Sequence, residues 1–72
     1  MERFLRYSLE RGRAIRLIYQ DDEGKMRQVS AQVTALAGGS VSFTTLRPRR
    51  DVTLPVSQLL SADYRKGDEG QE

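Results

Sequence analysis

Residues 26–46, MRQVSAQVTALAGGSVSFTTL, contain the pattern that decides the fold. From Met26 to Ala37, small or apolar residues alternate with polar ones, which is the period of a β-strand with one buried face. One face of this run holds Val29, Ala31, Val33, Ala35 and Ala37, and the other holds Gln28, Ser30, Gln32 and Thr34. Gly38-Gly39 predicts a two-residue turn with positive φ angles. Because residues 40–46 alternate again, the stretch predicts a β-hairpin.

The segments on both sides of this hairpin also predict strands. A strand from residue 13 to 20 places Ile15, Leu17 and Tyr19 on one face, and the acidic residues 21–24 form the next turn. After the hairpin we expect a turn at 47–51, a short strand at 52–54, a single 3₁₀ turn within 56–60 and a last strand at 61–65.

The N-terminal residues predict one short helix, from Glu2 to Glu10. Its apolar stripe is Phe4, Leu5, Ser8 and Leu9, at helical spacing, and Gly12 ends the helix. The fold class is therefore mainly β: a small five-stranded antiparallel barrel, SH3-like or Sm-like, with an N-terminal helix. The expected core consists of Ile15, Leu17, Val29, Val33, Val41, Phe43, Leu54 and Leu59.

Length and composition exclude most chemistry. The chain has 72 residues, including 12 Lys and Arg and 10 Asp and Glu, but no Cys and no His. The absence of Cys and His removes disulfides, thiolate and imidazole metal ligands, and the commonest catalytic bases. We therefore expect no enzyme activity, no metal and no cofactor, and a reducing cytoplasmic compartment. No apolar run is long enough to span a membrane. Since a core of this size is marginal, a homo-oligomer is expected.

The charges are unevenly distributed along the chain. Residues 63–72 hold four acids and two bases, whereas residues 1–62 hold ten bases and six acids. We expect one domain at 1–65 and a flexible charged tail at 66–72. Ten of the twelve cations are arginine, whose planar guanidinium pairs with phosphate or carboxylate through two hydrogen bonds. The folded part therefore favours an anionic partner, although an ordinary solvated surface is an alternative.

Residues 5–64 resemble the WYL domain, a bacterial ligand-sensing module with an Sm-like barrel. The similarity is carried by LERGRAIRLIY at 9–19, by DEGK at 22–25 and by LPVSQLLS at 54–61. These stretches are close to the family's short helix and first strand, its acidic hairpin and its closing strand. The resemblance implies a free-standing sensor or oligomerising module in transcription regulation, without its own DNA reader, because the chain has no room for a helix-turn-helix.

The candidate ligand-binding residues are mostly arginines. Arg47, Arg49 and Arg50 are expected in one tight turn in which Pro48 restricts the backbone. The other candidates are Arg16, Arg27 and Tyr19, and Arg13 could join them. The leading prediction is a regulatory module for a nucleotide or a single-stranded nucleic acid. Two alternatives stay open: a pure assembly or protein-interaction module whose second and fourth strands offer unpaired edges, and an Sm-like RNA-binding ring.

Overall fold

The alternating run at the centre of the sequence becomes the longest strand of an antiparallel sheet. The computed structural model describes residues 1–65. The strands are β1 (Ile15–Gln20), β2 (Met26–Ala37), β3 (Ser40–Leu46), β4 (Arg49–Pro55) and β5 (Leu59–Tyr64), joined in the order β4-β3-β2-β1-β5. A helix, α1 (Glu2–Arg11), precedes them, and a 3₁₀ turn, η1 (Val56–Gln58), links β4 to β5. The predicted mainly β, five-stranded antiparallel fold with an N-terminal helix is confirmed.

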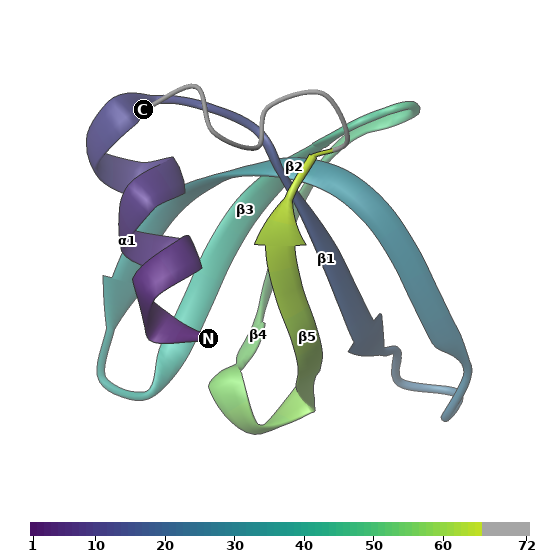
Figure 1. Cartoon of the computed structure of the whole chain (residues 1–72). Helices are drawn as coiled ribbons and strands as arrows, with labels where there is room; N and C mark the ends of the chain where they lie inside the picture. Colours follow the sequence, from purple (N-terminus) through teal and green to yellow (C-terminus); the bar gives the residue numbers. More distant parts are fainter. Residues whose placement is uncertain (66–72) are drawn as a thin grey trace.

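The sheet bends around itself, and its two ends differ (Figure 1). Helix α1 lies at one end, against β2, β5 and β1. At the opposite end the β1–β2 and β3–β4 hairpins diverge, one toward the lower right and the other toward the upper right of Figure 1. The barrel-like fold is therefore covered by the helix at one end and open between two hairpins at the other.

The core occupies the inner face of this bent sheet. Its members are Leu5, Ile15, Leu17, Ala31, Val33, Val41, Phe43, Leu54 and Leu59, each at most 7% exposed. Seven of the eight predicted core residues are thus confirmed as buried. Val29 is the exception, since it is only partly buried at the open end of the sheet.

Helix α1 packs on the sheet through three of the four residues of its predicted stripe, and Leu9 is the exception. Leu5 and Ser8 are buried and Phe4 is partly buried, but Leu9 is 36% exposed, so its predicted role in packing is wrong. Leu9 is exposed because the Ser8 hydroxyl hydrogen-bonds the backbone of β2, which places Ser8 at the centre of the buried helix face. Gly12 ends the helix with a φ of 65°, as predicted.

Two predicted details of the strands are wrong. The alternation of β2 does not continue to Ala37, because the register with β3 shifts between Val33 and Ala35. This irregularity leaves Ala35 exposed and turns Leu36 toward the core instead.

The turn expected at 47–51 contains only Arg47 and Pro48, whose peptide bond is cis. Residues 49–51 already belong to β4. Their charges are compatible with a strand because Arg49, Arg50 and Asp51 are all exposed there. The tail predicted at 66–72 lies outside the described residues.

Candidate functional site

The two diverging hairpins enclose a cleft at the open end of the sheet. Strand β2 pairs with β1 from Met26 onward, but with β3 only from Ala31 onward, so the sheet forks at residues 26–30. The cleft in this fork has a volume of about 410 Å³. We call it the hairpin cleft; it is lined by Tyr19, Asp21, Arg27, Val29, Thr45, Arg47, Pro48, Arg50 and Val52.

The cleft continues the inner face of the sheet outward from the core. Tyr19 and Arg27 are direct cross-strand partners, and so are Thr45 and Arg50. Paired residues project on the same face of a sheet, and Thr45 is buried. The Tyr19 ring packs edge-on against Phe43 of the core, with 5.6 Å between the ring centroids. Arg27 and Arg50 therefore extend from the same face that carries the hydrophobic core.

Hydrogen bonds to Thr45 hold the base of the β3–β4 hairpin. Its hydroxyl donates to the carbonyl oxygen of Pro48 at 2.5 Å and accepts the backbone N–H of Arg50 at 3.1 Å. These bonds fix the positions from which Arg47 and Arg50 project. Within residues 1–65, neither arginine has a carboxylate within the 4.0 Å of an ion pair.

Asp21 supplies the carboxylate in the lining of the hairpin cleft. One of its oxygens accepts the Arg27 Nε–H at 2.8 Å, and the other accepts the backbone N–H groups of Glu23 and Lys25, both at 2.9 Å. The hydrogen bond from Arg27, followed by the bond from the Lys25 backbone, holds the pKa of Asp21 below its usual value. Three guanidinium groups and one carboxylate leave the cleft with a net positive charge.

The structure gathers four of the six predicted site residues and separates two. Arg27, Arg47, Arg50 and Tyr19 line the hairpin cleft. Arg49 pairs with Leu46 in the β3–β4 ladder, one position from Arg50, and alternation places it on the outer face. Arg16 also lies on the outer face, 3.8 Å from the carboxylate of Asp63. The prediction that the three arginines share one tight turn is therefore wrong.

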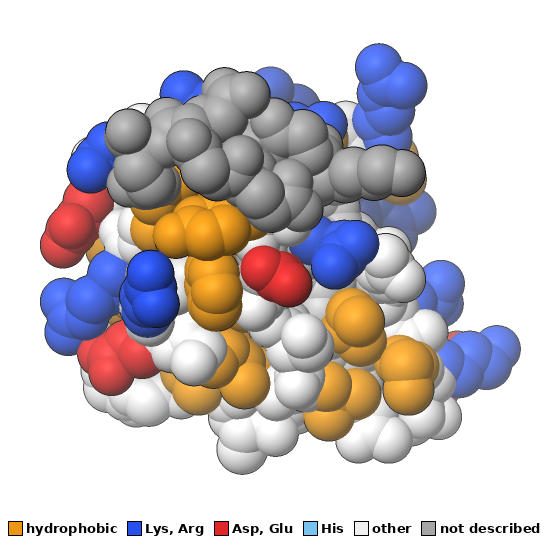
Figure 2. All heavy atoms as spheres, viewed as in Figure 1, with side chains coloured by type: hydrophobic (Ala, Val, Ile, Leu, Met, Phe, Trp, Pro, Cys, Tyr) orange, Lys and Arg blue, Asp and Glu red, His pale blue; other side chains and the backbone are white. Residues whose placement is uncertain are grey.

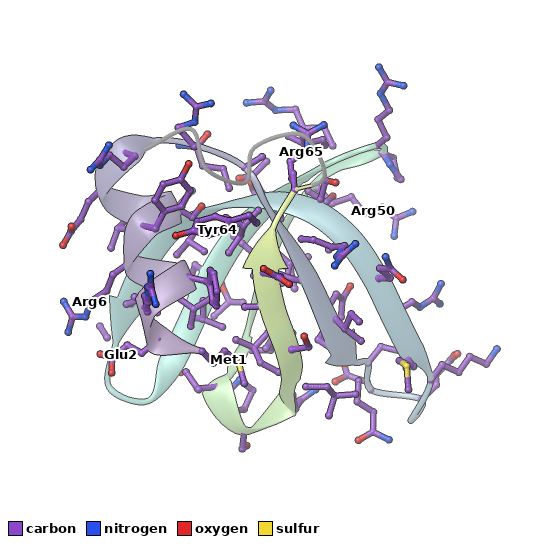
Figure 3. All side chains as sticks on the ribbon, viewed as in Figure 1. Met1, Glu2, Arg6, Arg50, Tyr64 and Arg65 are labelled. Atoms are coloured by element: carbon purple, nitrogen blue, oxygen red, sulfur yellow. The ribbon has the colours of Figure 1, made fainter. Side chains whose placement is uncertain are left out.

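Sequence reasoning missed the other half of the cleft. It treated Asp21 only as a turn residue, and it gave no role to Thr45 or Val52. The sequence did contain one signal of the cleft. A turn centred on residues 22–24 between β1 and β2 places Tyr19 opposite Arg27. Figure 2 shows Lys and Arg side chains along the edge where the hairpins end, and Figure 3 shows Arg50 on that same side.

The remaining tyrosines lie away from the hairpin cleft. Tyr7 and Tyr64 meet edge to face with 5.1 Å between their centroids, and Phe4 contacts Tyr64 in the same way at 4.9 Å. These rings join α1 to the end of β5, on the opposite side of Figure 3 from Arg50. Tyr19 is the aromatic residue that the sheet places in the cleft lining.

Two further findings concern the described part of the chain as a whole. Residues 1–65 contain no group of three His, Cys, Asp or Glu side chains close enough to hold a metal ion. Nor do they contain a helix with the length and apolar character that crossing a membrane requires.

Comparisons with protein-family models, with curated proteins and with solved structures found no match to this chain.

Proposed function

We propose that this protein is a non-enzymatic regulatory module that binds a negatively charged ligand in the hairpin cleft. The ligand class is a nucleotide or a short single strand of nucleic acid. The observation that carries the proposal is the convergence of Arg27, Arg47 and Arg50 from two hairpins. Two of these guanidiniums, those of Arg47 and Arg50, have no carboxylate partner among residues 1–65.

The chemistry of the lining fits a phosphate attached to a flat body. A guanidinium binds a phosphate through two parallel N–H donors. Two guanidiniums in one lining, each without a carboxylate partner among residues 1–65, suit one phosphate group. In the same lining, Tyr19, Val29 and Val52 form a partly buried apolar floor against which a base can lie. Stacking on an aromatic ring and contact with arginine are the usual means of binding unpaired nucleotides.

The proposal includes the resemblance to the WYL domain. In this view the chain is a cytoplasmic sensor that acts in bacterial transcription regulation. The small barrel supplies the scaffold, and the ligand is received at the end of the sheet that α1 does not cover. A DNA-reading partner protein would then carry out the response.

The test is binding of ATP and of a fluorescent six-nucleotide dT strand to the 72-residue chain. The measurement is isothermal titration for ATP and fluorescence anisotropy for the strand. We expect Arg50→Ser to weaken binding about tenfold, the effect of one lost charge-assisted contact. Arg49→Ser is the matched control, because it removes the same charge from the outer face one residue away. Equal affinities of the two variants would refute the cleft as the site.

Assembly is the second candidate function, and the sheet edges favour it. Within residues 1–65, the outer edges of β4 and β5 pair with no further strand. Residues 26–30 of β2 are likewise without a partner strand on one side. Unpaired edges of this kind can join to a second copy. We expect a homo-oligomer, and sedimentation that gives only the 8.2 kDa species at micromolar concentration would eliminate it.

A further inference from the structure

Among residues 1–65, the fork in the sheet leaves a short piece of strand backbone without a partner strand on one side. Residues 26–30 of β2 pair with β1, but β3 ends opposite Ser30 and does not extend further along them. In an antiparallel sheet, alternate residues direct both their N–H and their C=O toward the same neighbour. About half of the backbone groups in this piece of β2 therefore point into the fork, where a further strand can pair with them. We call residues 26–30 the open edge.

Both faces of the sheet are hollowed beside the open edge. On the inner face lies the hairpin cleft, and on the other side lies a second cleft of about 550 Å³. This outer cleft is lined by Gln28, Val29, Ser30, Leu46, Arg47 and Arg65. Val29 and Arg47 line both clefts, so the two hollows meet at the open edge.

Two hollows beside one backbone edge match the shape of an added strand. Side chains of an extended peptide point alternately to the two faces of the sheet that the peptide joins. The open edge is long enough for about four residues, or about 13 Å at the rise of a β-strand. One set of side chains would enter the hairpin cleft, and the other set would enter the outer cleft.

The charge of the clefts selects the peptide. In the hairpin cleft, three arginines, Arg27, Arg47 and Arg50, accompany the carboxylate of Asp21, which Arg27 already binds. The outer cleft adds Arg65 and Leu46. We propose that the open edge binds an extended acidic peptide by strand addition, with its carboxylates on the arginines of the hairpin cleft.

Strand addition explains the open edge, whereas a nucleic acid does not. A single strand of nucleic acid would contact the arginines and Tyr19 but has no N–H and C=O groups at strand spacing. The peptide site goes beyond the proposed function, and because both ligands contact Arg47 they compete for the protein.

The experiment uses two capped peptides of equal composition and charge. In one, Val and Glu alternate over six residues; in the other, three Val precede three Glu. The alternating peptide places all its carboxylates on one face, so we expect it to bind about tenfold more tightly than the blocked peptide. We also expect amide hydrogen exchange at alternate positions within residues 27–30 to slow by at least about tenfold at saturation.

Two further measurements separate this proposal from the proposed function. Leu46→Ser should weaken the alternating peptide about threefold and leave ATP binding unchanged, since Leu46 lines only the outer cleft, which receives the Val side chains of the peptide. Because both ligands contact Arg47, ATP should displace the peptide, whether or not the base of ATP stacks on Tyr19. If the peptide binds but ATP does not, the proposed function is refuted and the peptide site is not.

Three results would overturn the peptide site. The first is equal affinity for the two peptides, and the second is unchanged amide exchange at 27–30 in the presence of saturating peptide. The third is slow exchange at 27–30 in the protein without peptide, together with sedimentation as a dimer. That result would show that a second copy of the chain occupies the open edge.

Discussion

The hydroxyl of Ser8 in α1 accepts the backbone N–H of Val33 in β2, with 2.8 Å between oxygen and nitrogen. The same hydroxyl donates to the carbonyl oxygen of Arg13 at 2.6 Å. Ser8 and Val33 are 0% and 1% exposed, so this contact is closed to water. It lies directly before the register shift between Val33 and Ala35, where the β2–β3 ladder is interrupted. One buried serine therefore fixes the helix on the sheet.

Replacing this serine tests its role. Ser8→Ala should lower the free energy of unfolding by about 1–3 kcal/mol, because the buried N–H of Val33 loses its acceptor. Urea unfolding followed by circular dichroism measures the change. Ser57→Ala is the control, since Ser57 is exposed in η1 and should change stability by less than about 0.5 kcal/mol. Equal stabilities of the two variants would contradict the buried hydrogen bond.

The centre of the core makes a second prediction. Phe43 is 1% exposed and packs against Tyr19. Phe43→Ala should cost about 3–5 kcal/mol, which is a large part of the stability of a domain this small. Leu60→Ala, at a position 48% exposed, is the control and should melt close to the wild type. A cooperative melt of Phe43→Ala near the wild-type Tm would show that the core lies elsewhere.

Salt dependence tests the hairpin cleft against general surface charge. The double variant Arg47→Ser with Arg50→Ser should flatten the slope of log K against log salt by about 1.4 for single-stranded DNA. The matched control is Arg16→Ser with Arg49→Ser, which removes the same charge from the outer face. The control should keep the wild-type slope, and both variants should keep the wild-type Tm within a few degrees. Identical slopes for the two variants would assign binding to the net charge alone.

The carboxylate of Asp21 opposes any anion in the hairpin cleft. Asp21→Asn removes this charge and releases Arg27, while the amide oxygen can still accept the backbone N–H groups of the turn. The affinity for ATP at pH 7 should therefore rise about threefold, as expected for one charge acting through a water-like dielectric. Asp51→Asn is the control, because Asp51 bonds Thr44 on the outer face. A fall in affinity would mean that Asp21 positions Arg27 for the ligand.

Asp21 also makes the stability depend on pH. Its pKa is held below its usual value, chiefly by the hydrogen bond from Arg27. Its carboxylate therefore stabilises the folded chain above pH about 4, and this contribution disappears as the pH falls through the lowered pKa. The Tm of the wild type should exceed that of Asp21→Asn at pH 7, and the difference should shrink below pH about 4. A difference of the same size at pH 3 and pH 7 would argue against the ion pair.

The fold followed from alternation because most strands here have one buried face. Ile15, Leu17, Val41 and Phe43 could be assigned to the core from the sequence, since each lies two residues from another buried residue. Leu9 could not be excluded, because nothing in the pattern shows that Ser8 bonds across to β2. The register shift at Val33 and Ala35 was also hidden, since alanine is compatible with either face.

The candidate site was predictable as a set of residues but not as a surface. Pro48 and the charges around it suggested a longer turn, and the start of β4 at Arg49 could not be read from them. Without that start, the face of each arginine was undetermined. Arg27 and Tyr19 were nominated for their chemistry, and only the pairing of β1 with β2 places them side by side.

The number of residues in the turn at Arg47 and Pro48 decides which side chains of β4 face the hairpin cleft. Arg50 faces inward and Arg49 outward because the turn has two residues rather than three. One residue inserted after Pro48, with the rest of β4 kept in register, would leave Arg50 in place. Without that compensation the insertion would exchange the faces of all residues of β4, moving Val52 and Leu54 into solvent along with Arg50. The length of this turn and the hydrophobic core are therefore constrained together, so that relatives of this chain should vary the side chains of the turn more readily than its length.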